Sequence, residues 1–231
     1  MKDNFSKRYF EKFSPNYSLD NFSLIVDYLR GKKRKDILDV GCGDGRSLEV
    51  LNKYLNADVF GLEEAEGYKI KMKKNLAEKI FWMSILDGGI LKKVNRKFDA
   101  VIISRVLHHL VSQSPQKSKE LSCRAIRNAF KLTQKGGEVI ISEPIFEPAC
   151  LNSFVFYIKK FFSRITRRRV TLFGHWNNIG EPLVSYFTIN EIKELAHKYN
   201  IVEFKLEKYK STFLINFFFK RLEVFVVLRR K

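Results

Sequence analysis

The stretch ILDVGCGDGRSLEVL, residues 37 to 51, places three glycines within five residues, between an apolar segment and a helical pattern. Ile37, Leu38 and Val40 predict a buried strand, and the spacing of the apolar residues after the glycines predicts a helix. Glycine tolerates positive φ and lets a ligand approach the backbone, while the first turn of a helix has unpaired N–H groups. The sequence therefore predicts a ligand-binding turn between a strand and a helix.

Residues around this turn indicate which ligand it binds. The dinucleotide fingerprint G-x-G-x-x-G requires a third glycine where this chain has Arg46, and the third glycine is Gly45 instead, which disfavours a nicotinamide dehydrogenase. Asp39 would place a carboxylate beside the ligand, where it repels a pyrophosphate but suits a cationic amine or sulfonium. The pattern D-x-G-x-G-x-G resembles motif I of the class I S-adenosylmethionine (SAM) methyltransferases. The resemblance implies that Asp39, Gly41 and Gly43 bind SAM.

An acidic residue follows the second predicted strand. Val59, Phe60 and Leu62 predict that strand, and Glu63 comes directly after it, 20 residues beyond Gly43. In Rossmann-like proteins a carboxylate at this place accepts hydrogen bonds from both ribose hydroxyls. The resemblance therefore assigns Glu63 to the cofactor ribose.

A basic helix from Tyr68 to about Lys79 and then a third strand are expected next, within the stretch that ends in KIFWMSILDGG. In the methyltransferase pattern the loop after this strand contacts the adenine. Two registers are open: Ser84 and Ile85 occupy the adenine positions in one, and Asp87 occupies the acidic position in the other.

The segment RKFDAVIISRVLHHL, residues 96 to 110, predicts a fourth strand that ends near Ser104. It is similar to the family pattern F-D-x-V-x-x-x-x-x-L-H-H-L, and the resemblance places Ser104 in the cofactor site. His108 and His109 then lie near the transferred methyl group. Either could accept a proton from the acceptor, since the unperturbed histidine pKa is near neutrality. Alternatively, alignment of the acceptor with an already activated methyl group supplies most of the catalysis without a base.

The remaining pattern predicts the fold. A helix over residues 117–133, a fifth strand after Gly136 and Gly137, a helix capped by Thr188 or Asn190, and two further strands follow in order. We expect an α/β, doubly wound, seven-stranded and mostly parallel sheet, Rossmann-like, with an antiparallel last strand. The chain reads as one domain over residues 1–231, with a helical lead-in over 1–35 and a helical insert over 146–185 after strand five.

The insert is where the chain departs from a bare methyltransferase core. On a helical wheel its apolar residues fall within an arc of about 120° and most of its basic residues lie on the rest. The apolar set is Leu151, Phe154, Val155, Ile158, Phe161, Phe162 and Ile165; the polar and basic set is Lys159, Lys160, Ser163, Arg164 and Arg167. This pattern fits an interfacial membrane helix over residues 151–169, with Arg167 to Arg169 attracted to anionic lipid, or a lid packed on the domain with a solvated basic face.

Quinone and sterol methyltransferases, whose acceptors are lipids, carry hydrophobic inserts at this place. The resemblance is therefore nearest to the small-molecule and quinone-type enzymes, and favours a small or lipid-like acceptor. His175 and Trp176 could line the acceptor pocket or could belong to a polar loop.

Composition limits the alternatives. The formal charge of +18 implies an anionic partner, which is nucleic acid, an anionic membrane or an acidic substrate, although heavy lysine usage alone would also produce it. Cys42, Cys123 and Cys150 lack metal or disulfide spacing, and the four histidines are scattered, so no metal is expected. Without a spanning apolar run or a signal peptide, we expect a cytoplasmic location that includes the inner face of the membrane.

Two other functions stay open. A tRNA methyltransferase of the wobble-uridine type looks similar after strand four and would explain the charge, but its RNA-binding additions are not recognisable. A SAM-binding protein without transferase activity is the other. The acceptor, the methylated atom and the oligomeric state do not follow from the sequence.

Overall fold

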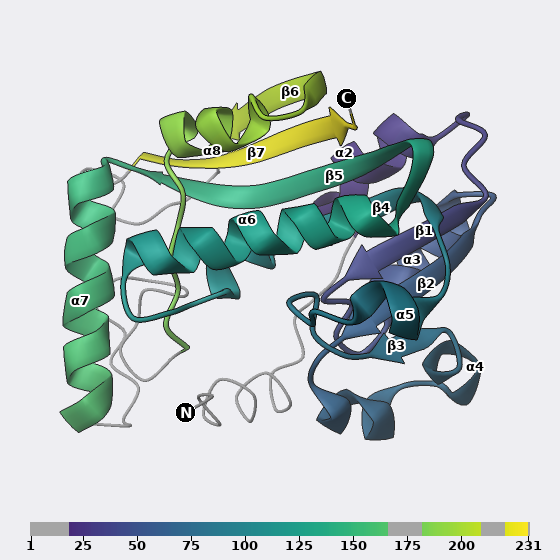
Figure 1. Cartoon of the computed structure of the whole chain (residues 1–231), viewed down its shortest axis with the longest axis horizontal. Coiled ribbons are helices and arrows are strands. Elements are labelled where there is room, and N and C mark those ends of the chain that lie inside the picture. The colour runs from purple at the N-terminus through teal and green to yellow at the C-terminus, as the bar shows by residue number, and fades with distance from the viewer. Residues whose placement is uncertain (1–18, 166–181, 209–219, 231) are drawn as a thin grey trace.

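The computed structural model describes residues 19–165, 182–208 and 220–230, and Figure 1 shows how their elements are arranged. Within these ranges seven strands form one sheet in the order β3-β2-β1-β4-β5-β7-β6. Strands β1 to β5 are parallel, while β7 runs antiparallel to both β5 and β6. This is the expected doubly wound, Rossmann-like sheet. The strand bounds are β1 Asp36–Val40, β2 Asp58–Glu63, β3 Ile80–Trp82, β4 Phe98–Ser104, β5 Thr133–Glu147, β6 Asn200–Lys208 and β7 Lys220–Arg229.

Helices cover both faces of the sheet because its central strands are apolar on both sides. Ile37 of β1 faces a layer with α2 and α3, and its neighbour Leu38 faces the layer with α5, α6 and α8. The helical elements are α2 Leu19–Leu29, α3 Arg46–Tyr54, η1 Glu66–Lys71, α4 Lys74–Ala77, α5 Ile90–Val94, η2 Leu107–His109, α6 Pro115–Leu132, α7 Ala149–Ile165 and α8 Ile189–Ala196. Among the described helices, none is long and apolar enough to cross a membrane.

The strand order positions the site. β1 lies between β2 and β4, and the connection after β1 leads to one face of the sheet while the connection after β4 leads to the other. Such a change of direction opens a crevice at the carboxyl ends of the two strands. The predicted glycine turn and the predicted histidines both lie at this edge.

The expected continuous helix from Tyr68 to Lys79 is not formed. The chain makes a 3-10 helix, then extends at Met72 and Lys73, and then makes the four-residue helix α4. Like charges three or four residues apart destabilise a helix, and Lys69, Lys71, Lys73 and Lys74 would be such neighbours. The break still lets Met72 bury its side chain near Gly45.

The end of the chain follows the prediction more closely. Thr188 caps α8: its side chain accepts a hydrogen bond from Glu191 N–H, and the Glu191 carboxylate accepts one from the backbone N–H of Thr188. β5 is longer than expected and pairs with β7 up to Glu147, so α7 begins directly at the end of the sheet. Figure 1 shows α7 standing across the end of β5, beside the site edge.

Candidate active site

The glycine turn after β1 has the backbone that its sequence predicts. Gly41, Gly43 and Gly45 all have positive φ, at 75°, 56° and 84°. A Cβ on Gly41 would lie 2.5 Å from Cγ2 of Val106, which belongs to the turn after β4. Gly41 is therefore needed both for its φ and because the two turns pack against each other.

Glu63 ties the glycine turn to the end of β2. Its Oε2 accepts a hydrogen bond from Gly43 N–H at 2.9 Å, and its Oε1 accepts one from Ala65 N–H at 2.8 Å. Burial raises the pKa of this carboxyl, and the backbone N–H groups oppose the rise. Each carboxylate oxygen can accept a second hydrogen bond, so Glu63 is oriented and still able to bind a hydroxyl.

Asp39 is buried at the end of β1. Burial raises its pKa to about 7, a hydrogen bond with Ser47 opposes the rise, and the nearby carboxylate of Glu63 adds to it. Two carboxyl groups held close together in a buried place favour a cation between or beside them.

The loop after β3 holds the candidate residues for the adenine. Ile85 is buried in the core, and its carbonyl accepts a hydrogen bond from Asn128 Nδ2 at 2.8 Å. Asp87 accepts hydrogen bonds from Gly89 N–H at 2.8 Å and from Lys93 Nζ at 2.6 Å, at the start of α5. Ser84 accepts a bond from Leu86 N–H at 3.3 Å. Asp87 is engaged at the helix start but, like Glu63, each of its oxygens can accept a second hydrogen bond, so both registers stay open.

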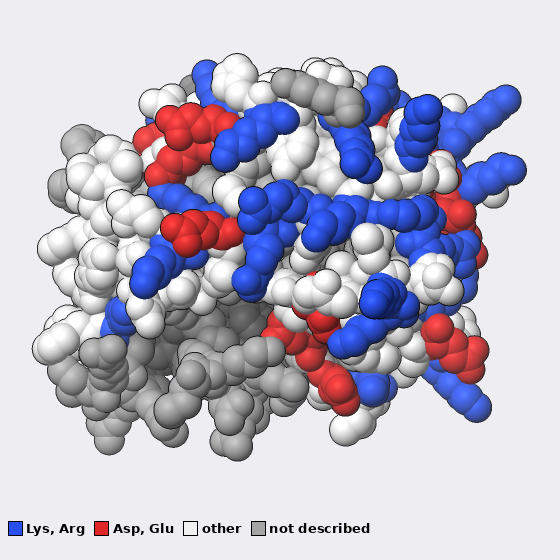
Figure 2. All heavy atoms as spheres, viewed as in Figure 1, with Lys and Arg blue, Asp and Glu red and all other residues white. Residues whose placement is uncertain are grey.

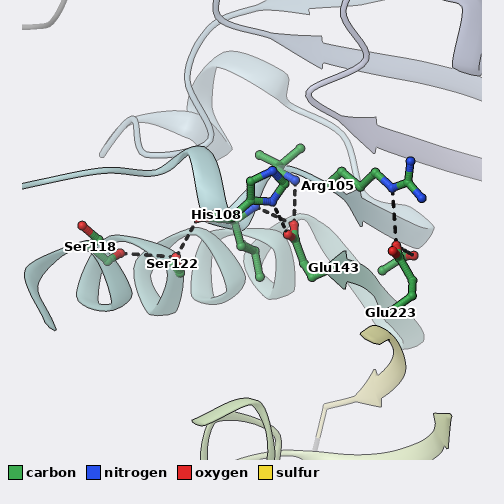
Figure 3. Close-up of polar contacts among 9 residues, drawn as sticks. Arg105, His108, Ser118, Ser122, Glu143 and Glu223 are labelled. Atoms are coloured by element: carbon green, nitrogen blue, oxygen red, sulfur yellow. Dashed lines mark hydrogen bonds and ion pairs between the residues drawn. The ribbon is translucent and has the colours of Figure 1, made fainter. Parts of the chain in front are cut away.

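The turn after β4 is held by a buried carboxylate on β5. Beyond Ser104, Arg105 has a φ of 57°, an uncommon value for a residue with a side chain. The following N–H groups of Val106 and Leu107 both donate to Oε1 of Glu143, each at 2.6 Å. Oε2 of Glu143 lies 2.6 Å from Nδ1 of His108, and Figure 3 shows these two side chains pointing toward each other.

His108 is enclosed, with 1% of its surface exposed. Its ring stacks on Tyr186 at 5.3 Å and lies 4.0 Å from the ring of His109, measured between centroids. Its carbonyl accepts a hydrogen bond from Ser185 N–H at 2.9 Å. The segment that returns from the insert therefore covers the histidine. His109 lies beside it, with the two rings tilted at 43° to each other.

Charged groups surround this histidine. Burial, aided by Arg105, Arg221 and Lys159, lowers the pKa of His108 to about 3. Burial also raises the pKa of Glu143 to about 8, against the effect of its hydrogen bonds from the turn. Arg105 Nε pairs with Oε1 of Glu223 on β7 at 3.4 Å (Figure 3). Because its pKa is lowered, the imidazole of His108 is neutral.

The orientation of α7 corrects the expectation for the insert. Phe156 and Lys159, which both lie outside the predicted apolar arc, are buried; Lys159 is only 1% exposed. Lys160 also turns inward and donates to the carbonyl of Gln113 at 2.6 Å. The aromatic residues lie outside instead: Phe154, Tyr157 and Phe161 are 60%, 50% and 59% exposed.

The helix packs on the domain, as the lid interpretation expects, but Lys159 of the expected solvated face is buried and Phe154 and Phe161 of the apolar arc are exposed. The cause is tertiary packing, because Lys159 lies close to the buried His108 and His109, which only the tertiary structure brings to this place. His175, Trp176 and Arg167 to Arg169 lie outside the described residues.

Several site residues were missed by the sequence reasoning. Glu143, Glu223 and Tyr186 come from β5, from β7 and from the segment after the insert, so no motif joins them. One signal was available for Glu143: it is a carboxylate within the apolar run of a predicted central strand, where an acid requires a partner.

Comparisons with known proteins agree with this geometry. A family model described as a methyltransferase domain matches residues 11–202. No curated protein sequence matches the chain significantly. Among solved structures, the chain is similar to the N-methyltransferase NodS from Bradyrhizobium japonicum in complex with S-adenosylhomocysteine, with a TM-score of 0.61, 14% identity and 99% of each chain covered.

Two further solved structures have the same fold. The YcgJ protein from Bacillus subtilis has a TM-score of 0.59 and 9% identity, with 93% of this chain and all of that chain covered. TehB from Haemophilus influenzae has a TM-score of 0.56 and 17% identity, with all of this chain and 67% of that chain covered. At these identities the structural matches establish the fold, and the family model establishes the family.

Proposed function

The chain belongs to the methyltransferase-domain family, and on that premise we propose that its acceptor is a small or lipid-like molecule taken up at a membrane surface. The protein is a SAM-dependent methyltransferase. When bound, SAM supplies a methyl group on a cationic sulfonium. The observation that carries the proposal for the acceptor is the exposed aromatic face of α7. The buried Lys159 of the same helix lies close to His108, in the turn after β4.

The residues of the glycine turn fit SAM. The turn has three positive-φ glycines, and Glu63 is already oriented with acceptor capacity for the ribose hydroxyls. Asp39 and Glu63 form a buried acidic pair whose pKa values are raised, and a cationic ligand would relieve their repulsion. We assign the loop after β3, in either register, to the adenine and Ser104 to the edge of the cofactor site at the end of β4.

The exposed stripe of α7 fits a lipid surface. Phe154, Tyr157 and Phe161 recur at intervals of three and four residues, so they share one side of the helix. Large aromatic residues with one wet side are typical of membrane interfaces. The inner side of the same helix carries Phe156, which lines a cleft together with Asn152 and Tyr186. Tyr186 in turn stacks on His108. The outer side of α7 therefore carries the exposed aromatic stripe, and its inner side faces the cleft beside Tyr186.

Binding to a membrane should require the aromatic stripe. We expect the protein to co-sediment with vesicles that contain anionic lipid, and to bind neutral vesicles much less, because of its charge of +18. Phe154→Ser combined with Phe161→Ser should release it while SAM binding and the melting temperature stay unchanged, since both side chains are exposed. Ile70→Ser is the matched control, because Ile70 is exposed at 92% on a different element.

If the double variant still sediments with the vesicles while Ile70→Ser behaves identically, the aromatic stripe is not a membrane contact. The acceptor class has a separate measurement. SAM with a labelled methyl group should transfer label to a lipid extract of the source cells, and a product only in the water-soluble fraction would contradict a lipid acceptor.

A tRNA methyltransferase is the second candidate, and one surface favours it. The outer side of α6 exposes Lys117, Arg124, Arg127 and Lys131, and Figure 2 shows basic side chains gathered across this part of the molecule. A row of cations of this kind attracts phosphates without reading sequence. Stacking aromatics do not accompany the row on the exposed side of α6, so we rank this function second.

Salt dependence separates the two candidates. Binding of total tRNA through the α6 row should be weak and should fall steeply as salt is raised. Arg124→Glu with Arg127→Glu should abolish it without changing vesicle binding. A methylated nucleoside that disappears from total tRNA when the gene is deleted would reverse the ranking.

A further inference from the structure

Glu143 is fully buried in the middle of β5, and all its visible contacts lead to the turn after β4. Oε1 accepts the N–H groups of Val106 and Leu107, and Oε2 faces Nδ1 of His108, each at 2.6 Å. A buried carboxylate is tolerated only when its oxygens are hydrogen-bonded. This one carboxylate therefore fixes the backbone of the turn and the ring of His108 together.

The contacts also determine which nitrogen of His108 can act. A backbone N–H can only donate, so Oε1 is an acceptor and the carboxylate orients Oε2 toward Nδ1. When Glu143 is ionised, Nδ1 carries the proton and Nε2 has a free lone pair on the edge of the ring away from Glu143. Nε2 is buried and has no hydrogen-bond partner among the described residues. An unmet acceptor in such a place is costly unless a ligand group completes it.

We propose that Glu143 is a positioning residue for methyl transfer, which holds His108 rather than His109 so that Nε2 accepts the proton of an acceptor hydroxyl. The inference rests on the proposed function, because it describes the acceptor side of the same site. As the hydroxyl oxygen forms its bond to the methyl carbon, its proton passes to Nε2. The carbon–sulfur bond breaks and its electron pair stays on the sulfur.

The charges around His108 select the class of acceptor. Three cations lie close enough to lower the pKa of this histidine, and they come from three different elements. Burial and these cations keep the imidazole neutral, and a neutral imidazole suits a neutral hydroxyl, which needs a base. The groups that face His108 are Arg105 of the β4 turn, Arg221 and the neighbouring Glu223 of β7, Lys159 of α7, Glu143 of β5 and the adjacent His109.

The tautomer of His108 gives the sharpest test, and it needs no acceptor. Nitrogen NMR of protein labelled in histidine, recorded above pH 8, should show Nδ1 protonated and Nε2 bare. In Glu143→Gln the amide oxygen keeps the two backbone donors, so its NH2 group faces Nδ1 and should force the proton onto Nε2. Glu223→Gln, which alters a neighbouring buried carboxylate, should leave the tautomer of His108 unchanged.

Transfer rates test the consequence. With labelled SAM and the lipid extract as the probe, the rate of the wild-type enzyme should rise as pH approaches about 8, where Glu143 ionises. Glu143→Gln and His108→Gln should each reduce the rate by about 100-fold or more, the usual contribution of a base. Glu143→Gln should lose the rise with pH and still bind SAM. Glu143→Asp should recover part of the rate, and His109→Gln should change it little.

The proposal is wrong if His108 carries its proton on Nε2 in the wild type above pH 8, or if Glu143→Gln leaves both tautomer and rate unchanged. An extract that accepts no label from any form of the enzyme would contradict the proposed acceptor class. It would not affect the NMR result, so the two failures are distinguishable.

Discussion

The turns after β1 and β4 meet at the same edge of the sheet but are built differently. The turn after β1 takes its shape from its own residues, because Gly41, Gly43 and Gly45 adopt positive φ within one contiguous motif. The turn after β4 includes Arg105, which has a side chain at positive φ, and is held by Glu143 from a neighbouring strand. One turn is encoded locally and the other is imposed by its surroundings.

This difference agrees with the two tasks of a methyltransferase. The cofactor is the same for every member of the family, so a short local motif can bind it. The acceptor differs from one enzyme to another, and the side of the site that we propose for it is assembled from β4, β5, β7, α7 and the segment that carries Tyr186. The contact between Val106 and Gly41 joins the two halves.

The largest expected effect tests that contact. Gly41→Ala should destabilise the fold by about 3–5 kcal/mol, because the new Cβ combines left-handed strain with a clash against Val106. Gly31→Ala is the matched control, because Gly31 has a φ of 78° and open space around its Cβ position. This variant should lose only about 1 kcal/mol of its free energy of unfolding. Denaturant unfolding measures both.

Adding Val106→Ala to Gly41→Ala should restore part of the lost stability, since it removes the clash and leaves the strain. Equal losses for Gly31→Ala and Gly41→Ala would show that the two turns do not depend on each other. The glycine motif would then serve its ligand alone.

An intermediate effect concerns Glu63. Both oxygens of Glu63 accept backbone N–H groups, so in Glu63→Gln the NH2 group must face one of those donors. The free energy of SAM binding should become less favourable by about 1–3 kcal/mol. The variant loses the negative charge of Glu63 and one of the hydrogen bonds that orient the glycine turn. Isothermal calorimetry would measure the affinity, with Glu66→Gln on the exposed surface of η1 as the control. An unchanged affinity would remove Glu63 from the cofactor site.

The smallest expected effect is a pH dependence. Because the pKa of Asp39 is raised to about 7, this carboxyl is largely protonated at pH 6 and ionised at pH 8. The ionised form attracts a sulfonium, so SAM affinity should rise with pH across this range, by up to about tenfold. Asp39→Asn should abolish the rise.

S-adenosylhomocysteine is the matched ligand for this measurement, because its sulfur is uncharged. Its affinity should depend on pH much less than that of SAM. The same pH profile for both ligands would mean that Asp39 does not respond to the sulfonium, and the local motif would then bind its cofactor by shape alone.

Much of the cofactor side was predictable from residue order. The strand, the glycine turn and the helix of residues 37 to 51 are local structures, so spacing and glycine content predict them without the rest of the chain. Parallel strands joined by helices then restrict the topology to the doubly wound sheet that is observed. Glu63 could be placed for the same reason, since the end of β2 lies beside the end of β1 in that sheet.

The sequence by itself determined the strands, the family motifs and the glycine turn, because each depends on residues close together in the chain, and the rules for connecting parallel strands then determined the sheet. Only the tertiary structure decided which histidine meets a carboxylate, since Glu143 lies 35 residues from His108 and reaches it through strand pairing. It also decided which side of α7 is buried. A helical wheel ranks side chains by polarity, but Lys159 is buried close to His108 and His109, and Phe154, Tyr157 and Phe161 are left outside.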